Sequence, residues 1–136
     1  MKQAVFVFDH IALTVANLQK SMQWYSDTFG FESLRVFDKP DLKLRGGHMS
    51  LGNLKLELLA PYEPRPLPEY RKKLETDLMT VGTKHLALRV DDLNSAYEDL
   101  KKKGVEFLSE PNTGKKSTHI FCRDLDGILI EIREEL

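Results

Sequence analysis

Apolar and polar residues alternate with two periods along the chain, and these periods predict strands and helices. Apolar side chains recur at helical spacing between Asn17 and Gly30, which predicts a helix over residues 18–29 that begins after Asn17 and ends at Gly30. The stretches FESLRVF, LKLRGGHMSL and LKLELLA then indicate three strands separated by turn residues. The apolar run AVFVF before Asp9 predicts a further strand at the start of the chain.

The second half of the chain repeats this order. KHLALRV at residues 84–90 matches DHIALTV at residues 9–15, and a helix between Asp92 and Gly104 follows it. The stretches VEFLS, THIFCR and ILIEIR indicate three more strands, with a turn at DLDG between the last two. The pattern therefore predicts an α+β fold made of two βαβββ modules, because each half reads strand, helix and three strands.

The expected modules are joined by a proline-rich segment. Four of the six prolines lie between residues 61 and 68, and a short helix is possible near residues 69–79. We expect one domain over residues 1–136, because 136 residues suffice for a single core. Within it, the first half-module covers about residues 5–60, the linker residues 61–83, and the second half-module about residues 84–134.

Strand parity places one histidine and one glutamate of each module on the face away from its helix. His10 and His85 begin the repeated strands, and Glu57 and Glu131 lie between aliphatic residues in the last strands. The spacing agrees, since 47 residues separate His10 from Glu57 and 46 separate His85 from Glu131. Two imidazoles and two carboxylates suit Zn²⁺, Ni²⁺, Co²⁺, Mn²⁺ or Fe²⁺ and leave coordination positions for a substrate.

Each of these residues also has an ordinary structural interpretation. A lone strand histidine is more often a hydrogen-bonded side chain than a ligand, and a single glutamate is usually on the solvent face of its strand. The joint pattern in both modules favours the metal site. His48 and His119 could approach the cavity, but each is interpreted as a plain strand residue. Cys122 is interpreted as a buried apolar residue without an activated thiolate.

Composition narrows the possible partners. The 20 basic and 21 acidic residues nearly cancel, so nothing indicates nucleic acid or an anionic membrane, and a small-molecule substrate is expected. Cys122 is the only cysteine, which excludes an internal disulfide and fits a reducing cytoplasm. The apolar run before Asp9 is shorter than the core of a signal peptide, so we predict a cytoplasmic protein.

At these residues the sequence resembles the vicinal oxygen chelate superfamily, in its glyoxalase I-like branch. The similar stretches cover nearly the whole chain and include DHIALTV, SMQWYSDTFGF, KLELLAP, KHLALRVDDL, KKKGVEF and FCRDLDGILIEI. The resemblance implies paired βαβββ modules that form an incomplete β-barrel around a metal site, usually in a homodimer. It places His10, Glu57, His85 and Glu131 at the ligand positions of the glyoxalase I and epimerase branches.

The resemblance also implies a reaction. One divalent ion per site, with Zn²⁺, Ni²⁺ or Co²⁺ as leading candidates, would bind two substrate oxygens and stabilise an enediolate while a carboxylate moves the proton. Glu131 is the expected base, and Glu57 could take the mirror role. The expected activity is that of a lactoylglutathione lyase-type enzyme acting on a 2-oxo compound or its thiol adduct.

Departures from the family pattern leave the substrate open. Thr14 stands where glutathione-dependent bacterial enzymes tend to have arginine, and Pro61 where they tend to have asparagine. Arg89 takes the arginine's symmetric place in the second module and could hold an anionic group. Methylmalonyl-CoA-type epimerisation is the alternative. Glu57, as a fourth ligand, argues against an extradiol dioxygenase, and the intact ligand set argues against a drug-binding relative. The site could be built within one chain or from two exchanged halves.

Overall fold

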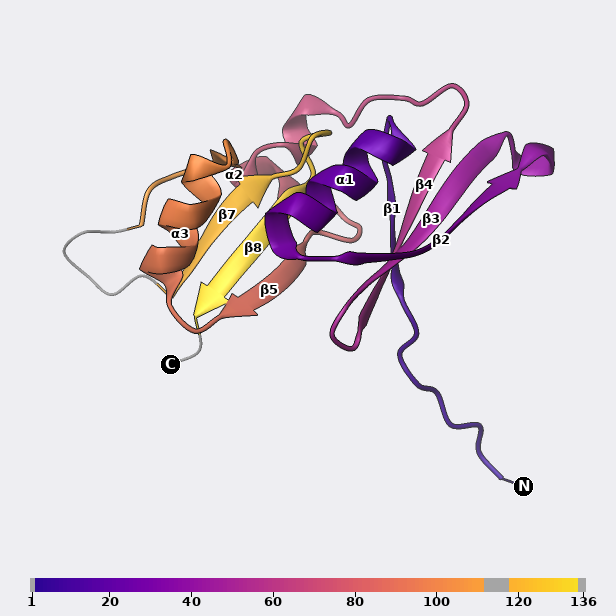
Figure 1. The fold of residues 1–136 in the computed structure, drawn as a ribbon, viewed down its shortest axis with the longest axis horizontal. Helices are drawn as coiled ribbons and strands as arrows, with labels where there is room; N and C mark the ends of the chain where they lie inside the picture. The colour runs from indigo at the N-terminus through magenta and orange to yellow at the C-terminus, as the bar shows by residue number, and fades with distance from the viewer. Residues whose placement is uncertain (1, 112–117, 135–136) are drawn as a thin grey trace. The chain divides into compact units, whose positions relative to one another are not determined.

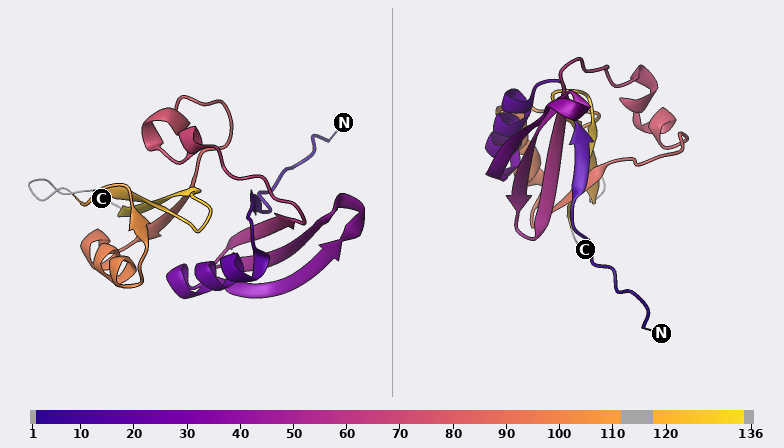
Figure 2. Two further views of the ribbon diagram at one scale, coloured as in Figure 1. Left: turned by 90° about the horizontal axis from the view of Figure 1, so that it is seen from above. Right: turned by 90° about the vertical axis from the view of Figure 1, so that its right-hand side faces the viewer.

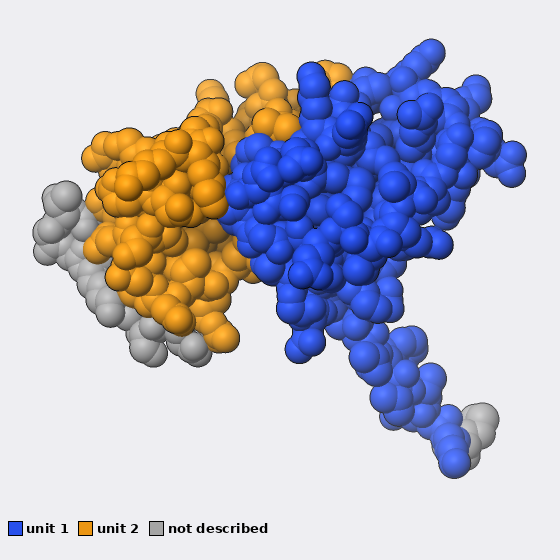
Figure 3. All heavy atoms as spheres, in the orientation of Figure 1, with its two compact units in different colours: residues 1–65 blue, residues 66–136 orange. Residues whose placement is uncertain are grey.

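The computed structural model describes residues 2–111 and 118–134 of the chain. The chain divides into two compact units, residues 1–65 and residues 66–136 (Figure 3). Each unit contains one four-stranded sheet, and neither sheet closes on itself. The α+β class and the two βαβββ modules predicted from the sequence are confirmed.

Unit 1 has a sheet with strand order β1-β4-β3-β2, in which β1 runs parallel to β4 and the other pairs are antiparallel (Figure 1). Its elements are β1 (Ile11–Thr14), α1 (Leu18–Phe29), β2 (Glu32–Lys39), the 3₁₀ turn η1 (Pro40–Leu42), β3 (Leu44–Leu51) and β4 (Leu54–Pro61).

Helix α1 forms where the sequence predicts it and covers one face of this sheet. The Asn17 side chain accepts a hydrogen bond from the backbone N–H of Lys20 at 2.9 Å, and Gly30 ends the helix with φ of 84°. Gly47 on β3 allows a close approach, because a Cβ atom there would lie 2.5 Å from Met22 Sδ. The helix therefore occupies one face of the sheet and leaves the other face for chemistry.

Unit 2 repeats this arrangement with strand order β5-β8-β7-β6, again with a parallel first pair. Its elements are η2 (Glu69–Arg71), α2 (Leu74–Asp77), β5 (Leu86–Val90), α3 (Leu93–Lys102), β6 (Glu106–Phe107), β7 (His119–Arg123) and β8 (Leu129–Glu134). Asp92 begins α3 by accepting a hydrogen bond from the backbone N–H of Ser95 at 3.1 Å. Figure 2 shows from two further sides that each long helix lies along a sheet.

The segment that leads into β5 is held by a buried carboxylate. Asp77 is 1% exposed, and its Oδ1 lies 3.0 Å from Arg71 Nε and 3.4 Å from Lys84 Nζ. Arg123 Nε on β7 donates a 2.8 Å hydrogen bond to the carbonyl of Lys72. The short helix predicted near residues 69–79 is thus present as two short pieces that these contacts fasten to unit 2.

The strand predicted at AVFVF is wrong. No strand is assigned over residues 2–10, and the side chains from Val5 to Phe8 are 77% to 92% exposed. The register explains this, because Ile11 pairs with Leu56 and β4 begins at Leu54. Residues 4–8 therefore extend past the end of their only neighbouring strand in the sheet. The incomplete barrel, the single domain and the boundaries of the half-modules stay predictions.

Candidate functional site

The open face of the unit 1 sheet carries the first histidine and glutamate. His10 directly precedes β1, and Ala12 on β1 lies beside Glu57 on β4. His10 Nε2 is 3.8 Å from Glu57 Oε1, while His10 Nδ1 lies 2.6 Å from Asp9 Oδ2. Because a carboxylate accepts, Nδ1 carries the ring proton and Nε2 faces Glu57. This hydrogen bond, followed by the charge of Lys55, lowers the pKa of Asp9 below its usual value.

The second oxygen of Glu57 is held by His48. His48 on β3 pairs with Glu57 across the hairpin, and its Nε2 lies 2.7 Å from Glu57 Oε2. Arg35 Nε donates a 3.1 Å hydrogen bond to His48 Nδ1. A guanidinium can only donate, so Nδ1 accepts and the ring proton of His48 lies on Nε2, pointing at Glu57. His48 therefore has a direct contact with a candidate ligand that its interpretation as a plain strand residue missed.

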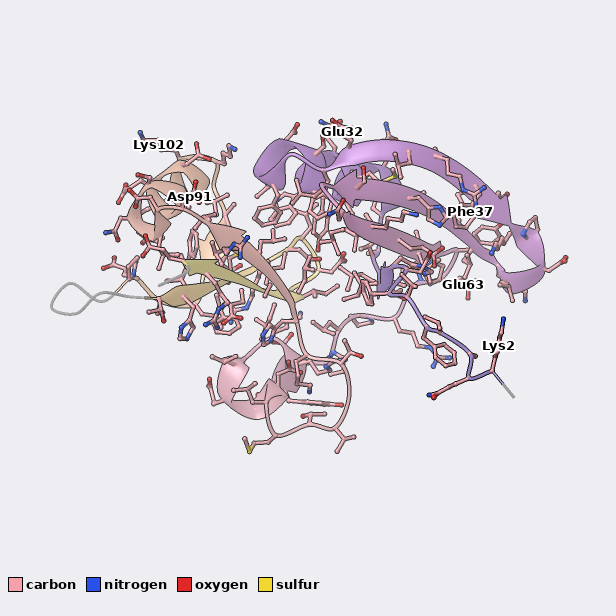
Figure 4. The ribbon with its side chains drawn as sticks, turned by 90° about the horizontal axis from the view of Figure 1, so that it is seen from below. Lys2, Glu32, Phe37, Glu63, Asp91 and Lys102 are labelled. Carbon is pink, nitrogen blue, oxygen red and sulfur yellow. The ribbon has the colours of Figure 1, made fainter. Side chains whose placement is uncertain are left out.

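An aromatic ring lies beside this histidine. Phe37 projects from β2, where Figure 4 labels it, and its ring centroid is 5.2 Å from that of His48. Gly46 makes room for the ring, because a Cβ atom there would clash with Phe37 Cζ. The guanidinium of Arg35 lies 5.2 Å from the centre of the same ring. The open face of unit 1 thus combines carboxylate, imidazole and aromatic groups.

The unit 2 sheet carries the second pair at the equivalent positions. His85 directly precedes β5, and its Nε2 lies 3.6 Å from Glu131 Oε1 on β8. The Glu131 side chain is 10% exposed, and its Oε2 lies 3.1 Å from Arg133 Nη1. The ring of Phe121 lies edge to face with His85 at 5.0 Å. Within the described part of the chain, the buried His85 Nδ1 has no hydrogen-bond partner.

The structure therefore gathers the four predicted ligands into two pairs, one in each unit. The nitrogen and oxygen of each pair are too far apart for a hydrogen bond. They are close enough for both to bind one ion, since two bonds of about 2.1 Å span up to about 4 Å. Among residues 2–111 and 118–134, no group of three or more potential ligands gathers around a single point. A common ion for both pairs stays a prediction.

Two further sequence predictions concern unit 2. Arg89 lies on β5 two residues beyond Ala87, which pairs with Glu131, so it shares the face of Glu131. Cys122 on β7 is fully buried, and burial raises its pKa to about 12. The prediction of a buried cysteine without an activated thiolate is therefore confirmed.

A hollow of about 760 Å³ in unit 1 lies on the helix side of the sheet. Its lining includes Asn17, Met22, Arg45 and Tyr62, and contains no histidine, carboxylate or cysteine. It therefore lacks groups for acid–base chemistry or metal binding. The open face with Glu57 is the better candidate for function.

The geometry agrees with a comparison to known protein families. The family model described as Glyoxalase/Bleomycin resistance protein/Dioxygenase superfamily matches residues 7–132. The chain belongs to this superfamily. Among the residues of this protein that the structure describes, no helix is both long enough and apolar enough to cross a membrane.

Individual relatives cover nearly the whole chain. The mitochondrial methylmalonyl-CoA epimerase of Homo sapiens is 29% identical in an alignment of 131 positions that covers 93% of this chain and 72% of the epimerase. The lactoylglutathione lyase of Escherichia coli O157:H7 is 28% identical in an alignment of 130 positions that covers 93% of this chain and 90% of the lyase. The crystal structure of the glyoxalase family protein from Enterococcus faecalis matches with a TM-score of 0.73 and 27% identity, over 94% of this chain and 97% of that one. Its superfamily relatives thus include both lyases and epimerases.

Proposed function

We propose that the protein is a metal-dependent enzyme that moves a proton at a carbon next to a carbonyl group. The observation that carries this proposal is the repeated pair of donor atoms, His10 Nε2 with Glu57 Oε1 at 3.8 Å and His85 Nε2 with Glu131 Oε1 at 3.6 Å. Similarity to a lyase and to an epimerase supports it, since both names denote enzymes acting on small molecules.

The two pairs would together hold one divalent ion. Nitrogen and oxygen donors suit Zn²⁺, Ni²⁺ or Co²⁺, and the two pairs would come from one chain or from two chains of a dimer. The hydrogen bond from His10 to Asp9 resembles the outer contacts that orient ligating histidines in metal sites. When bound, the ion supplies positive charge that stabilises the negative charge developing on the substrate's carbonyl oxygen.

Glu131 is the proposed base, and its surroundings differ from those of Glu57. His48 holds Oε2 of Glu57 at 2.7 Å, which fixes that carboxylate in place. In unit 2 the corresponding neighbour of Glu131 is Phe121, and the donor to Glu131 Oε2 is instead Arg133 Nη1 at 3.1 Å, on a side chain that is 52% exposed. Glu131 is also 10% exposed, so water competes less for its oxygens. Its carboxylate is therefore held by a longer contact to a more exposed side chain than Glu57 is, which favours Glu131 as the group that takes a proton from carbon and returns it.

A reaction of the glyoxalase I type fits this assignment, with a 2-oxo compound or its thiol adduct as substrate. Epimerisation of a methylmalonyl-CoA-like thioester is the second candidate. The 29% identity with the human epimerase over 93% of the chain favours this second candidate. So do Thr14 and Pro61, because glutathione-dependent enzymes tend to have arginine and asparagine at these two positions. Both candidates need the same proton transfer and differ in the group attached to the carbonyl.

A homodimer is the proposed assembly, and the N-terminal segment supports it. The consecutive side chains Val5, Phe6, Val7 and Phe8 are between 77% and 92% exposed, and Figure 1 shows this segment leaving the sheet of unit 1. Four exposed large apolar residues in a row are unusual for an isolated surface and typical of one that a partner covers. Phe6→Asp is expected to shift a dimer toward monomer in analytical ultracentrifugation, whereas a wild-type monomer at micromolar concentration contradicts the assembly.

Elemental analysis tests the metal site. We expect about one divalent ion per site in the purified wild-type protein and its loss in Glu57→Ala and His85→Ala. Glu98→Ala, an exposed glutamate on α3, is the matched control and should keep the metal. Full metal retention in both ligand variants, with circular dichroism unchanged, would refute the site.

Solvent exchange tests the reaction. The wild-type protein is incubated in D₂O with methylmalonyl-CoA, or with the adduct of methylglyoxal and glutathione, and deuterium incorporation is followed by NMR. Exchange with the thioester supports epimerisation, and conversion of the adduct supports the lyase activity. Glu131→Gln should reduce either rate by about a hundredfold or more, since general base catalysis contributes about that much. A wild-type rate in Glu131→Gln would refute its role as base.

A further inference from the structure

Lys84 directly precedes the candidate ligand His85, and the charged end of its side chain is held by three acceptors. Its ammonium group donates a 2.6 Å hydrogen bond to the carbonyl of Asp77 and another to the carbonyl of Thr80. The carboxylate of Asp77 accepts a third hydrogen bond from the same nitrogen at 3.4 Å. An ammonium group has three N–H donors, so these acceptors use all of them.

The preceding residue, Thr83, is fastened by the same segment. Arg71 Nη2 donates a hydrogen bond to the carbonyl of Thr83, and Arg71 Nε donates one to Asp77 at 3.0 Å. Asp77 is 1% exposed, so water cannot replace its contacts when one is lost. The two residues that lead into His85 are therefore both held by side-chain contacts. We call Arg71, Asp77 and Lys84 the clamp.

Unit 1 orients its histidine in a different way. The repeat aligns DHIALTV with KHLALRV, which places Asp9 at the position of Lys84. Asp9 accepts a 2.6 Å hydrogen bond from His10 Nδ1, which fixes the imidazole ring. An ammonium group can only donate, so Lys84 cannot accept a hydrogen bond from the ring of His85.

The ring of His85 is held by packing and by its backbone. In the part of the chain that the structure describes, its buried Nδ1 has no hydrogen-bond partner. The ring of Phe121 lies edge to face with it at 5.0 Å, and its Nε2 is 3.6 Å from Glu131, which is too long for a hydrogen bond. The ladder between β5 and β8 begins only at Leu86. The position of the ring therefore depends on the backbone just before this ladder, which the clamp holds.

We propose that the clamp positions His85 for metal binding, so that Lys84 and Asp77 are positioning residues of the site. The inference rests on the proposed function, because it takes His85 as a metal ligand. Bonds to a metal tolerate deviations of about 0.2 Å in length, so a ligand at the start of a strand needs its backbone held in place. Loss of such outer contacts typically weakens metal binding about 10- to 100-fold.

The affinity of the full chain for Zn²⁺ tests the clamp. Lys84→Met keeps the apolar stem of the side chain and removes all three hydrogen bonds. We expect about a tenfold weaker affinity in competition with a chromophoric chelator. The direction is informative, because removing a positive charge beside a ligand would by electrostatics alone strengthen cation binding. Lys102→Met removes a charge from the exposed end of α3 and should change nothing.

NMR of the metal-free protein tests whether the effect passes through His85. The ring signals of His85 should shift or broaden in Lys84→Met. Those of His10 are the internal control and should stay unchanged, because Asp9 holds that ring. Asp77→Asn keeps the shape of the acceptor without its charge and should have the same effect on His85. Lys84→Arg keeps a charged donor and should restore most of the zinc affinity, which separates loss of the clamp from misfolding.

Wild-type zinc affinity in Lys84→Met overturns the proposal, even where urea shows a loss of stability, because the clamp would then be only structural. Weaker affinity with unchanged His85 signals overturns it too. If the His85 signals change while the wild-type protein binds no zinc, the clamp positions the ring and the proposed function fails. If the wild-type protein binds zinc and Lys84→Met binds it equally well, only the clamp fails.

Discussion

Replacement of His48 by alanine should weaken metal binding without unfolding the protein. The change removes the 2.7 Å contact between His48 Nε2 and Glu57 Oε2. A hydrogen bond to a charged group contributes about 1.5–3 kcal/mol, which corresponds to about 10- to 150-fold in affinity. The side chains of His48 and Glu57 are 32% and 18% exposed, so water replaces part of the lost bond. We therefore expect the lower end, about a tenfold weaker affinity.

The assay is competition for Zn²⁺ between the protein and a chromophoric chelator. His48→Gln should lose less affinity than His48→Ala, because its amide can still donate to Glu57. Arg45→Ala is the control, since Arg45 lies on the same strand β3 but on the opposite face. Urea unfolding of each variant separates a loss of affinity from a loss of stability. Equal affinity in the wild type and His48→Ala would show that His48 does not orient Glu57 for a metal.

Three further predictions concern stability and reactivity. Leu58→Ala should lower the free energy of unfolding by about 3 kcal/mol, because Leu58 is fully buried, and a loss below about 1 kcal/mol in urea would contradict this core position. Asp77→Ala should lower it by about 2–3 kcal/mol because it leaves Lys84 and a nearby arginine without their carboxylate, whereas the exposed Glu75→Ala should not. Burial raises the pKa of the Cys122 thiol to about 12, so this thiol stays protonated at pH 8. A thiol reagent should therefore label it slowly until guanidinium unfolds the protein. Fast labelling of the folded chain would refute its burial.

Local signals were sufficient for most of the secondary structure. The helix predicted over residues 18–29 has those bounds, because Asn17 and Gly30 define both ends through their own side chain and backbone preferences. The strand predicted at AVFVF failed for a different reason. Its β propensity is high, but a strand needs a neighbour, and β4 begins only at Leu54. The length of the neighbouring strand is a property of the sheet, so it cannot be predicted from the segment AVFVF itself.

The contact of His48 could have been found by counting residues across the hairpin. Gly52 and Asn53 form the turn between β3 and β4, so Leu51 faces Leu54 and each step outward adds one residue on either side. Three steps bring His48 opposite Glu57. The position of Arg35 beside His48 is harder to predict, because a register shift between residues 33 and 35 moves β2 against β3.

The repeat in the sequence marks only the positions that its two copies share. These positions include the two histidines and two glutamates, which are the groups that a shared ion would need. The differences lie at matched positions of the two sheets, where His48 corresponds to Phe121 and Leu59 to Arg133. Glu57 is held at 2.7 Å by His48, whereas Glu131 has an aromatic ring at the matching position and is held at 3.1 Å by the exposed Arg133. Because both sheets provide the same backbone frame, these substitutions give the two carboxylates different surroundings, and the proposed reaction would use that difference by keeping Glu57 in place while Glu131 moves the proton.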